Sequence, residues 1–128
     1  MTHRRITRRA FILAVLFCLT TITVPAQSDR TMRIRFSRGR TTKVIRDAVV
    51  RGTRDRYLLR ASAGQTLIVH ITSLENNAVF DIHSPRGRHM LTQEATDWTG
   101  ELQRSGDYVI VVGGTRGNAS YTLEVTVR

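Results

Sequence analysis

The sequence contains a single cysteine, Cys18, among its 128 residues. Cys18 lies in an uncharged apolar run over 10–24, which follows four arginines and ends at the compact residues Val24-Pro25-Ala26. This arrangement is typical of a secretory signal peptide, and we predict one over 1–26. The alternative is a retained membrane anchor. Three threonines near the end of the run disfavour it, because a span takes about 20 predominantly apolar residues.

A lipid-attachment site at Cys18 is also disfavoured, because the bulky Phe17 precedes it. Removal of the signal peptide leaves no cysteine, which excludes disulfides, thiolate zinc sites and cysteine catalysis. The remaining residues, 27–128, have the length of one domain. We therefore predict a single periplasmic or secreted domain with no membrane span after cleavage.

Lysine and acidic residues are scarce. Lys43 is the only lysine, and residues 27–128 carry 16 basic and 10 acidic side chains, a net charge of +6. Arginine keeps its charge at any relevant pH and pairs with carboxylates and phosphates through a planar fork. Outside the cytoplasm, such a surface suits anionic glycans, lipid headgroups or acidic clefts of other proteins. The alternative is that the charge only maintains solubility.

Helical periodicity is absent from residues 27–128, and alternation of apolar and polar residues replaces it. Glycine, asparagine and proline turns separate the alternating runs. We predict an all-β fold, an antiparallel β-sandwich of jelly-roll type with about eight short strands. The clearest predicted strands cover 32–36, 43–50, 56–61, 65–73, 79–84, 108–112 and 121–128. The pattern is weakest over 89–102, where we expect Trp98 to pack under a longer crossover, and 27–31 is expected to be a loose leader.

Few residues favour catalysis. Asp81 and His83 are two residues apart on one predicted strand, but a metal site needs three or more convergent ligands. No serine lies in a nucleophile-elbow motif, and the aromatic residues fall at core positions rather than along a basic stripe. We therefore predict a binding protein that is not an enzyme, with no metal, no cofactor and no nucleic-acid partner.

The most informative stretch begins at Ser105-Gly-Asp-Tyr108. It leads through an apolar run to a loop in which Gly113, Gly114 and Gly117 surround Arg116. Such glycines fit a hairpin tip that projects beyond the sheet and places one guanidinium at its apex. The alternative is an ordinary mobile hairpin whose arginine contacts only water.

Several motifs together resemble the bacterial pre-peptidase C-terminal domains, and among these most closely the periplasmic inhibitors of goose-type lysozyme. The motifs are Arg35-Phe-Ser-Arg-Gly39, Tyr57-Leu-Leu-Arg-Ala-Ser-Ala-Gly-Gln65, Phe80-x-Ile82-x-Ser-Pro85, Ser105-Gly-Asp-Tyr108 and Ala119-x-Tyr121-x-Leu-x-Val125. The similarity covers about 32–128. It implies an exported jelly-roll-like sandwich without a cofactor.

The resemblance also implies a binding site. In the inhibitors, the loop after the Ser-Gly-x-Tyr strand presents arginines to the catalytic acids of lysozyme. Arg116 falls at the position of the first arginine, and Ser120 occupies the position expected for the second. On this basis Arg116, Ser105, Tyr108 and Tyr57 are the predicted partner-binding residues, with Ser105 and Tyr108 bracing the loop and Tyr57 lining its base. The predicted partner is a lysozyme-type glycosidase, and the alternative is an anionic envelope glycan bound without inhibition.

Overall fold

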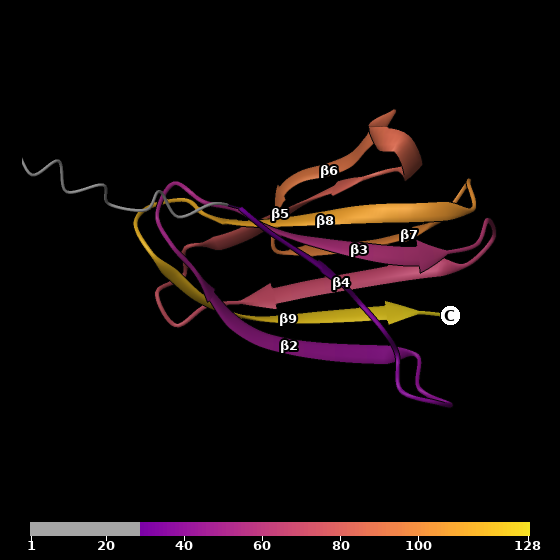
Figure 1. Cartoon of the computed structure of the whole chain (residues 1–128), viewed down its shortest axis with the longest axis horizontal. Coiled ribbons are helices and arrows are strands. Elements are labelled where there is room, and N and C mark those ends of the chain that lie inside the picture. Colours follow the sequence, from indigo (N-terminus) through magenta and orange to yellow (C-terminus); the bar gives the residue numbers. More distant parts are fainter. Residues whose placement is uncertain (1–28) are drawn as a thin grey trace, which may run out of the picture.

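Two sheets packed face to face form the body of the molecule, shown in Figure 1. The structure is a computed structural model that describes residues 29–128; the predicted signal peptide over 1–26 lies outside them. The described residues contain nine strands: β1 (Arg30–Arg33), β2 (Thr42–Val49), β3 (Asp55–Ala61), β4 (Thr66–Thr72), β5 (Ala78–His83), β6 (Met90–Ala95), β7 (Asp97–Glu101), β8 (Gly106–Gly114) and β9 (Ala119–Val127). A short 3-10 turn, η1 (Pro85–Gly87), joins β5 to β6.

The strand order confirms the predicted sandwich. One sheet runs β1-β3-β8-β5-β6 and the other β2-β9-β4-β7. From β2 to β9 the chain changes sheet at every connection except the one from β5 to β6, which is the winding of an eight-stranded jelly roll. The ninth strand, β1, adds to the edge of the first sheet and runs parallel to β3, whereas the other pairings are antiparallel.

The core lies between the sheets and consists of alternate residues of the strands. In β9, Tyr121, Leu123, Val125 and Val127 are buried, and the residues between them face outward. The same alternation buries Leu67, Val69 and Ile71 in β4 and Tyr57, Leu59 and Ala61 in β3. Fully burying such a side chain contributes about 1.5–3 kcal/mol, so these rows hold the two sheets together.

Two regions differ from the sequence-based expectation. The weak stretch over 89–102 contains two strands, β6 and β7, and Trp98 lies in β7 rather than under a crossover. The expected loose leader is ordered from Asp29 onward, because β1 begins at Arg30 and pairs with β3. Ion pairs fix this segment, including Arg56 with Asp29 at 3.2 Å.

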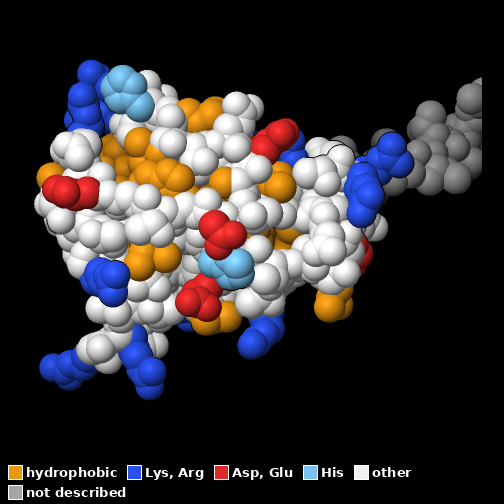
Figure 2. Space-filling model, turned by 180° about the vertical axis from the view of Figure 1, so that it is seen from behind, with side chains coloured by type: hydrophobic (Ala, Val, Ile, Leu, Met, Phe, Trp, Pro, Cys, Tyr) orange, Lys and Arg blue, Asp and Glu red, His pale blue; other side chains and the backbone are white. Residues whose placement is uncertain are grey.

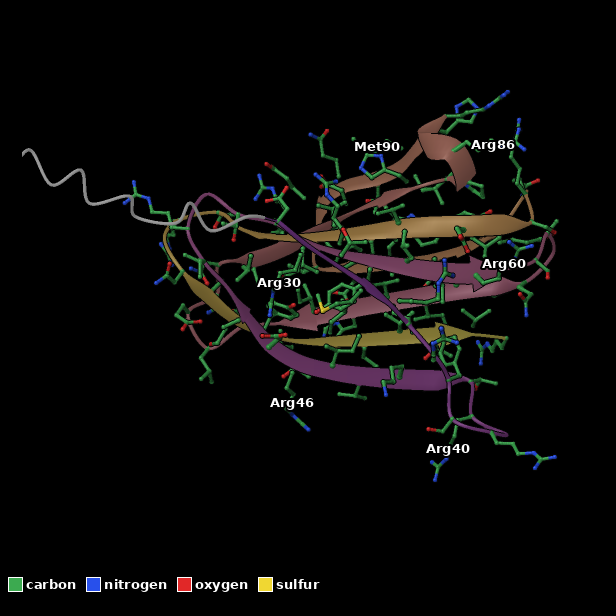
Figure 3. All side chains as sticks on the ribbon, in the orientation of Figure 1. Arg30, Arg40, Arg46, Arg60, Arg86 and Met90 are labelled. Carbon is green, nitrogen blue, oxygen red and sulfur yellow. The ribbon has the colours of Figure 1, made fainter. Side chains whose placement is uncertain are left out.

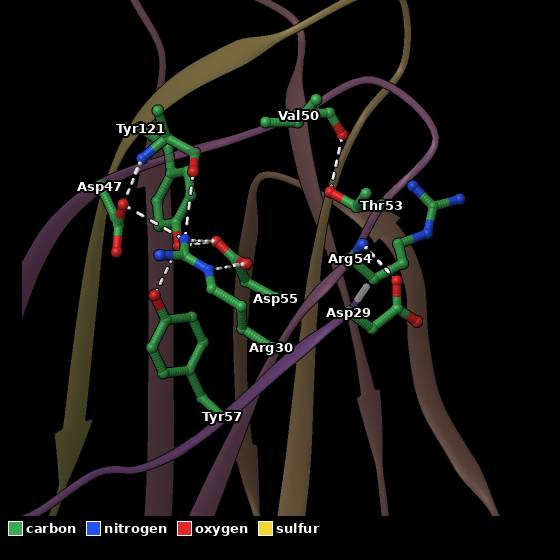
Figure 4. A network of polar contacts seen from close by, with 10 residues as sticks. Asp29, Arg30, Asp47, Val50, Thr53, Arg54, Asp55, Tyr57 and Tyr121 are labelled. Atoms are coloured by element: carbon green, nitrogen blue, oxygen red, sulfur yellow. Dashed lines mark hydrogen bonds and ion pairs between the residues drawn. The ribbon is translucent and has the colours of Figure 1, made fainter. Parts of the chain in front are cut away.

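A polar network closes the β1/β2 side of the sandwich (Figure 4). Arg30 donates through Nε and Nη2 to the two carboxylate oxygens of Asp55, at 2.9 and 2.7 Å, and Asp55 is only 2% exposed. The Tyr121 hydroxyl donates to Asp55 at 2.6 Å, so the Tyr57 hydroxyl, 2.5 Å away, donates to Tyr121. Burial, the largest cause, raises the pKa of both tyrosines. Because Tyr121 and Asp55 belong to different sheets, the network ties the sheets together.

Candidate partner-binding site

Four connections between the sheets meet at one end of the sandwich. They are the β2–β3, β4–β5, β6–β7 and β8–β9 connections, and their strands are paired at this end, as in Val49 with Ala119 and Ala78 with Gly114. The loop carrying Arg116 is the β8–β9 connection. It is a crossover between sheets, so the predicted hairpin tip is wrong. The reason is that β8 pairs with β3 and β5, whereas β9 pairs with β2 and β4.

Asn77, in the β4–β5 connection, holds the Arg116 loop through hydrogen bonds to its backbone. Its side-chain amide donates to the backbone carbonyls of Arg116 at 2.7 Å and Asn118 at 3.0 Å, and its carbonyl accepts from Ser73 Oγ. The Thr115 amide donates to the Asn77 backbone carbonyl at 2.8 Å. Asn77 is 4% exposed, and its side chain links the β4–β5 connection to the β8–β9 connection. The loop is therefore fixed rather than freely mobile.

The Arg116 side chain is exposed, and its Nη2 donates to the backbone carbonyl of Glu75 at 3.2 Å. No carboxylate within residues 29–128 forms an ion pair with it. A neutral carbonyl orients the guanidinium without cancelling its charge. Arg116 thus retains a full positive charge and free donors for another molecule.

The carboxylate of Glu75, the residue whose backbone carbonyl accepts from Arg116, is hydrogen-bonded by two serines. Ser120 donates to it from its hydroxyl at 2.9 and 3.0 Å and from its backbone amide at 3.2 Å, and Ser73 donates from its hydroxyl at 2.9 Å. The Ser120 hydroxyl is the largest cause of a lowered pKa at Glu75. Ser120, at the position where the resemblance implies a second arginine, therefore fixes the Glu75 carboxylate.

A second cationic group comes from another connection. The backbone amide of Arg51, in the β2–β3 turn, donates to the Asn118 side chain at 2.8 Å, which joins this turn to the Arg116 loop. The Arg51 side chain is exposed and forms no ion pair within the part of the chain that the structure describes. Sequence reasoning missed Arg51 because 65 positions separate it from Arg116 and only the fold brings the two together.

Apolar side chains accompany the two arginines. Leu74 is 94% exposed and Val50 is 41% exposed, although both are large hydrophobic residues. Leu74 lines a depression of about 370 Å³ on the outer face of the β2-β9-β4 sheet, next to Ser73 and Ser120. We call the surface formed by Val50, Arg51, Leu74 and Arg116 the docking end.

The remaining predicted site residues lie elsewhere. Ser105 and Tyr108 are at the start of β8, and Arg116 follows its end; a nine-residue strand separates them, a distance of about 30 Å. Ser105 Oγ accepts from the Ala63 amide, and the Tyr108 hydroxyl donates to the Arg104 carbonyl. They therefore do not brace the Arg116 loop, and that expectation is wrong.

Tyr57 is not a surface residue either. It is 2% exposed, and its hydroxyl is engaged by Tyr121 in the buried network, so its ring is closed to a partner. Tyr108, at 1% exposed, is equally buried in the core. Both tyrosines occupy inward-facing core positions of their strands, so neither has the binding role that the resemblance implied.

No group of three His, Cys, Asp or Glu side chains in the described residues is placed to hold a metal ion. Asp81 accepts a hydrogen bond from the Glu94 backbone amide at 2.7 Å, which gives it a structural role in the β5–β6 pairing. Within the same residues, no helix has the length and apolar character needed to cross a membrane.

Asn77→Ala is expected to lower the free energy of unfolding by about 2 kcal/mol, because the backbone carbonyls of Arg116 and Asn118 lose the side-chain amide that donates to them. Urea denaturation followed by circular dichroism measures the change. The matched control is Asn118→Ala, whose side chain is exposed and accepts one hydrogen bond, and whose effect should be much smaller. Equal stability of both variants would contradict the supporting role of Asn77.

Comparison with known proteins shows the same architecture in solved structures. No family model matches the chain, and no curated protein sequence matches it. The crystal structure of PliG, a periplasmic lysozyme inhibitor of g-type lysozyme, from Aeromonas hydrophila superimposes with a TM-score of 0.70 at 24% identity, covering 79% of this chain and 98% of that one. PliG of Salmonella Typhimurium gives 0.63 at 18% identity, covering 77% and 98%.

A more distant match is the pre-peptidase C-terminal domain of a collagenase from Bacillus anthracis, with a TM-score of 0.50 at 12% identity, covering 78% of this chain and 94% of that one. These matches span nearly the whole length of the solved structures. The chain therefore has the β-sandwich fold of the PliG inhibitors and of the pre-peptidase C-terminal domain.

Proposed function

We propose that this chain is an exported inhibitor of a g-type lysozyme, which it binds through the docking end. The observation that carries the proposal is the state of Arg116: the loop is held by Asn77, and the guanidinium is exposed and forms no ion pair with a carboxylate of residues 29–128. The fold shared with the PliG inhibitors supports the choice of partner. Export to the periplasm follows from the predicted signal peptide.

The proposed mechanism is electrostatic blockage. Lysozymes hydrolyse glycosidic bonds with acidic groups in an open cleft. An arginine inserted into such a cleft forms charge-assisted hydrogen bonds to a carboxylate. Two parallel N–H groups of the guanidinium can donate to the two oxygens of one carboxylate. The exposed Leu74 and Val50 beside the arginine supply apolar area, which excludes water from the contact.

Arg51 supplies the second positive charge in this proposal. The β8–β9 connection carries one arginine, and the β2–β3 turn that carries Arg51 is hydrogen-bonded to this connection through Asn118. Two cationic groups on two rigid connections can engage two acidic groups of one cleft. In this proposal Arg51 takes the role of the second arginine that the resemblance implies at position 120.

Arg116→Gln is expected to raise the concentration needed for half-inhibition of a g-type lysozyme by about 30-fold or more. Removing one partner of a desolvated charge pair costs about 2 kcal/mol or more. Cell-wall lysis assays with the purified domain, residues 27–128, and the variant measure this effect. The matched control is Arg40→Gln, at the opposite end of the sandwich, which should inhibit like the unaltered domain (Figure 3).

Two results contradict the proposal: no inhibition by the unaltered domain, or equal inhibition by the Arg116→Gln variant. Salt-sensitive retention on anionic envelope glycan without any inhibition would favour the competing hypothesis, a non-inhibitory envelope module. That hypothesis draws on the cationic surface, because only Arg30, Arg33 and Arg56 among the arginines of residues 29–128 form ion pairs with carboxylates.

A further inference from the structure

The two lateral sides of the sandwich are closed differently. On the β1/β2 side, the network of Arg30, Asp55 and Tyr121 joins the sheets. On the opposite side the edge strands are β6 and β7, and between them a pocket of about 240 Å³ opens to solvent. We call this the edge pocket; its apolar lining is formed by Leu91, Trp98, Leu102 and Tyr108.

The base of the edge pocket lies in the core. Leu102 and Tyr108 at its base are each 1% exposed, while Leu91 and Trp98 at its walls are half-buried. The indole of Trp98 lies over Gly100, where a Cβ atom would come within 2.6 Å of the ring. Glycine at this position therefore lets the indole lie along β7.

Arginines border the edge pocket. Arg104 lines it and also lines an adjacent depression together with Arg86 and Arg88; we call these three the arginine rim. None of them forms an ion pair with a carboxylate of residues 29–128, although Glu101 lines one wall of the pocket. Figure 2 shows hydrophobic side chains gathered beside the arginine and histidine side chains at this corner, at the upper left.

Hydrogen bonds hold the backbone that carries the arginine rim. The hydroxyl of the buried Tyr108 accepts from the Arg104 amide at 3.3 Å and donates to its carbonyl at 2.6 Å. The turn carrying Arg86 and Arg88 is fixed by Ser84, which is 4% exposed and whose Oγ accepts from the His89 amide at 3.0 Å. This turn also packs on β8, since a Cβ atom at Gly106, where φ is +145°, would meet Pro85 at 2.9 Å.

We propose that the edge pocket and the arginine rim form a second docking site, which takes an extended acidic segment of another protein and receives one large apolar side chain from it. The pocket volume lies below the roughly 300–1,000 Å³ of sites that enclose a whole small molecule. It therefore suits a single anchoring side chain, with acidic neighbours on the arginine rim. The free edges of β6 and β7 offer unpaired backbone groups to an extended segment.

Other occupants fit less well. A flat membrane surface cannot reach Leu102 and Tyr108 at the base of the recess. A second copy of residues 27–128 carries the same net charge of +6 and is repelled. The docking end is about 30 Å away along β8, so the two sites can be occupied by different partners at once.

The test uses the capped peptide Asp-Glu-Phe-Glu-Asp as a probe and the fluorescence of Trp98, the only tryptophan of the chain, as the readout. We expect saturable binding with a blue-shifted emission that weakens as salt is added. The control peptides Asp-Glu-Ala-Glu-Asp and Ser-Gln-Phe-Gln-Ser, which lack the anchor and the charge respectively, should each bind at least tenfold more weakly.

Variants locate the binding. Arg88→Gln combined with Arg104→Gln should weaken it at least tenfold, and Leu91→Gln should do the same, whereas Arg116→Gln at the docking end should leave it unchanged. Equal binding of all three peptides, or no effect of the Arg88 and Arg104 substitutions, overturns the proposal. Binding to phosphatidylglycerol vesicles through the same residues, without binding to the peptide, also overturns it.

Discussion

Asp55→Ala is expected to lower the free energy of unfolding by about 3 kcal/mol. Asp55 is 2% exposed and accepts three hydrogen bonds, two of them from the charged Arg30 and one from Tyr121. Hydrogen bonds to charged groups contribute about 1.5–3 kcal/mol, and breaking a buried pair costs about 3–5 kcal/mol. We expect the lower end of the 3–5 kcal/mol range, because Arg30 is not left as a buried unpaired charge. Its side chain is 48% exposed and keeps Asp47 as a partner at 3.2 Å.

Small domains have stabilities of about 5–15 kcal/mol, so this loss is a large fraction of the total. Differential scanning calorimetry should show a fall in Tm of about 15 °C, at about 4–8 °C per kcal/mol. The matched control is Asp107→Ala, which removes the exposed bidentate pair with Arg33 and should have little effect. Equal shifts for the two variants would show that the network does not hold the sheets together.

The second large effect is expected when both arginines of the docking end are removed. Arg51→Gln with Arg116→Gln should weaken lysozyme binding by about 1,000-fold, if each charge pair contributes about 2 kcal/mol. The reason is that in the proposed complex the two side chains reach the cleft from separate connections, so neither can replace the other. Isothermal titration of the unaltered domain, both single variants and the double variant measures the four affinities.

A double-mutant cycle then separates the contributions. If the contacts are independent, the losses of binding free energy add, so the two single losses of about 30-fold multiply to about 1,000-fold. A double variant carrying Arg116→Gln and Arg40→Gln serves as the control and should bind like Arg116→Gln alone. If Arg51→Gln binds as tightly as the unaltered domain, Arg51 has no part in the site, while the role of Arg116 is still decided by its own variant.

Much of the fold could be predicted because burial leaves a period-2 pattern. The alternation in 121–128 and 65–73 predicted strands there, and the structure has β9 and β4 in these ranges. The pattern failed over 89–102, where the β5–β6 pairing contains register shifts and Glu94 adopts a positive φ of 49°. A bulge of this kind changes the face on which successive residues lie, so alternation is lost although the strand continues.

The candidate site was only partly predictable. Glycines around Arg116 indicated an exposed loop, and the structure places the guanidinium at the surface. The Ser105-Gly-Asp-Tyr108 motif looked close to that loop because the sequence separation is short. A strand is an extended segment, and the nine residues of β8 carry the chain from one end of the sandwich to the other.

The sequence by itself determined the class of fold, the residues of the core and the excess of arginine, because these depend on side-chain polarity and on spacing along the chain. Only the tertiary structure decided that β8 and β9 belong to different sheets, that Asn77 supports the Arg116 loop, and that Arg51 lies beside it. The physical reason is that a jelly roll pairs strands distant in sequence. Contacts across its ends therefore follow from strand order, which local patterns do not encode.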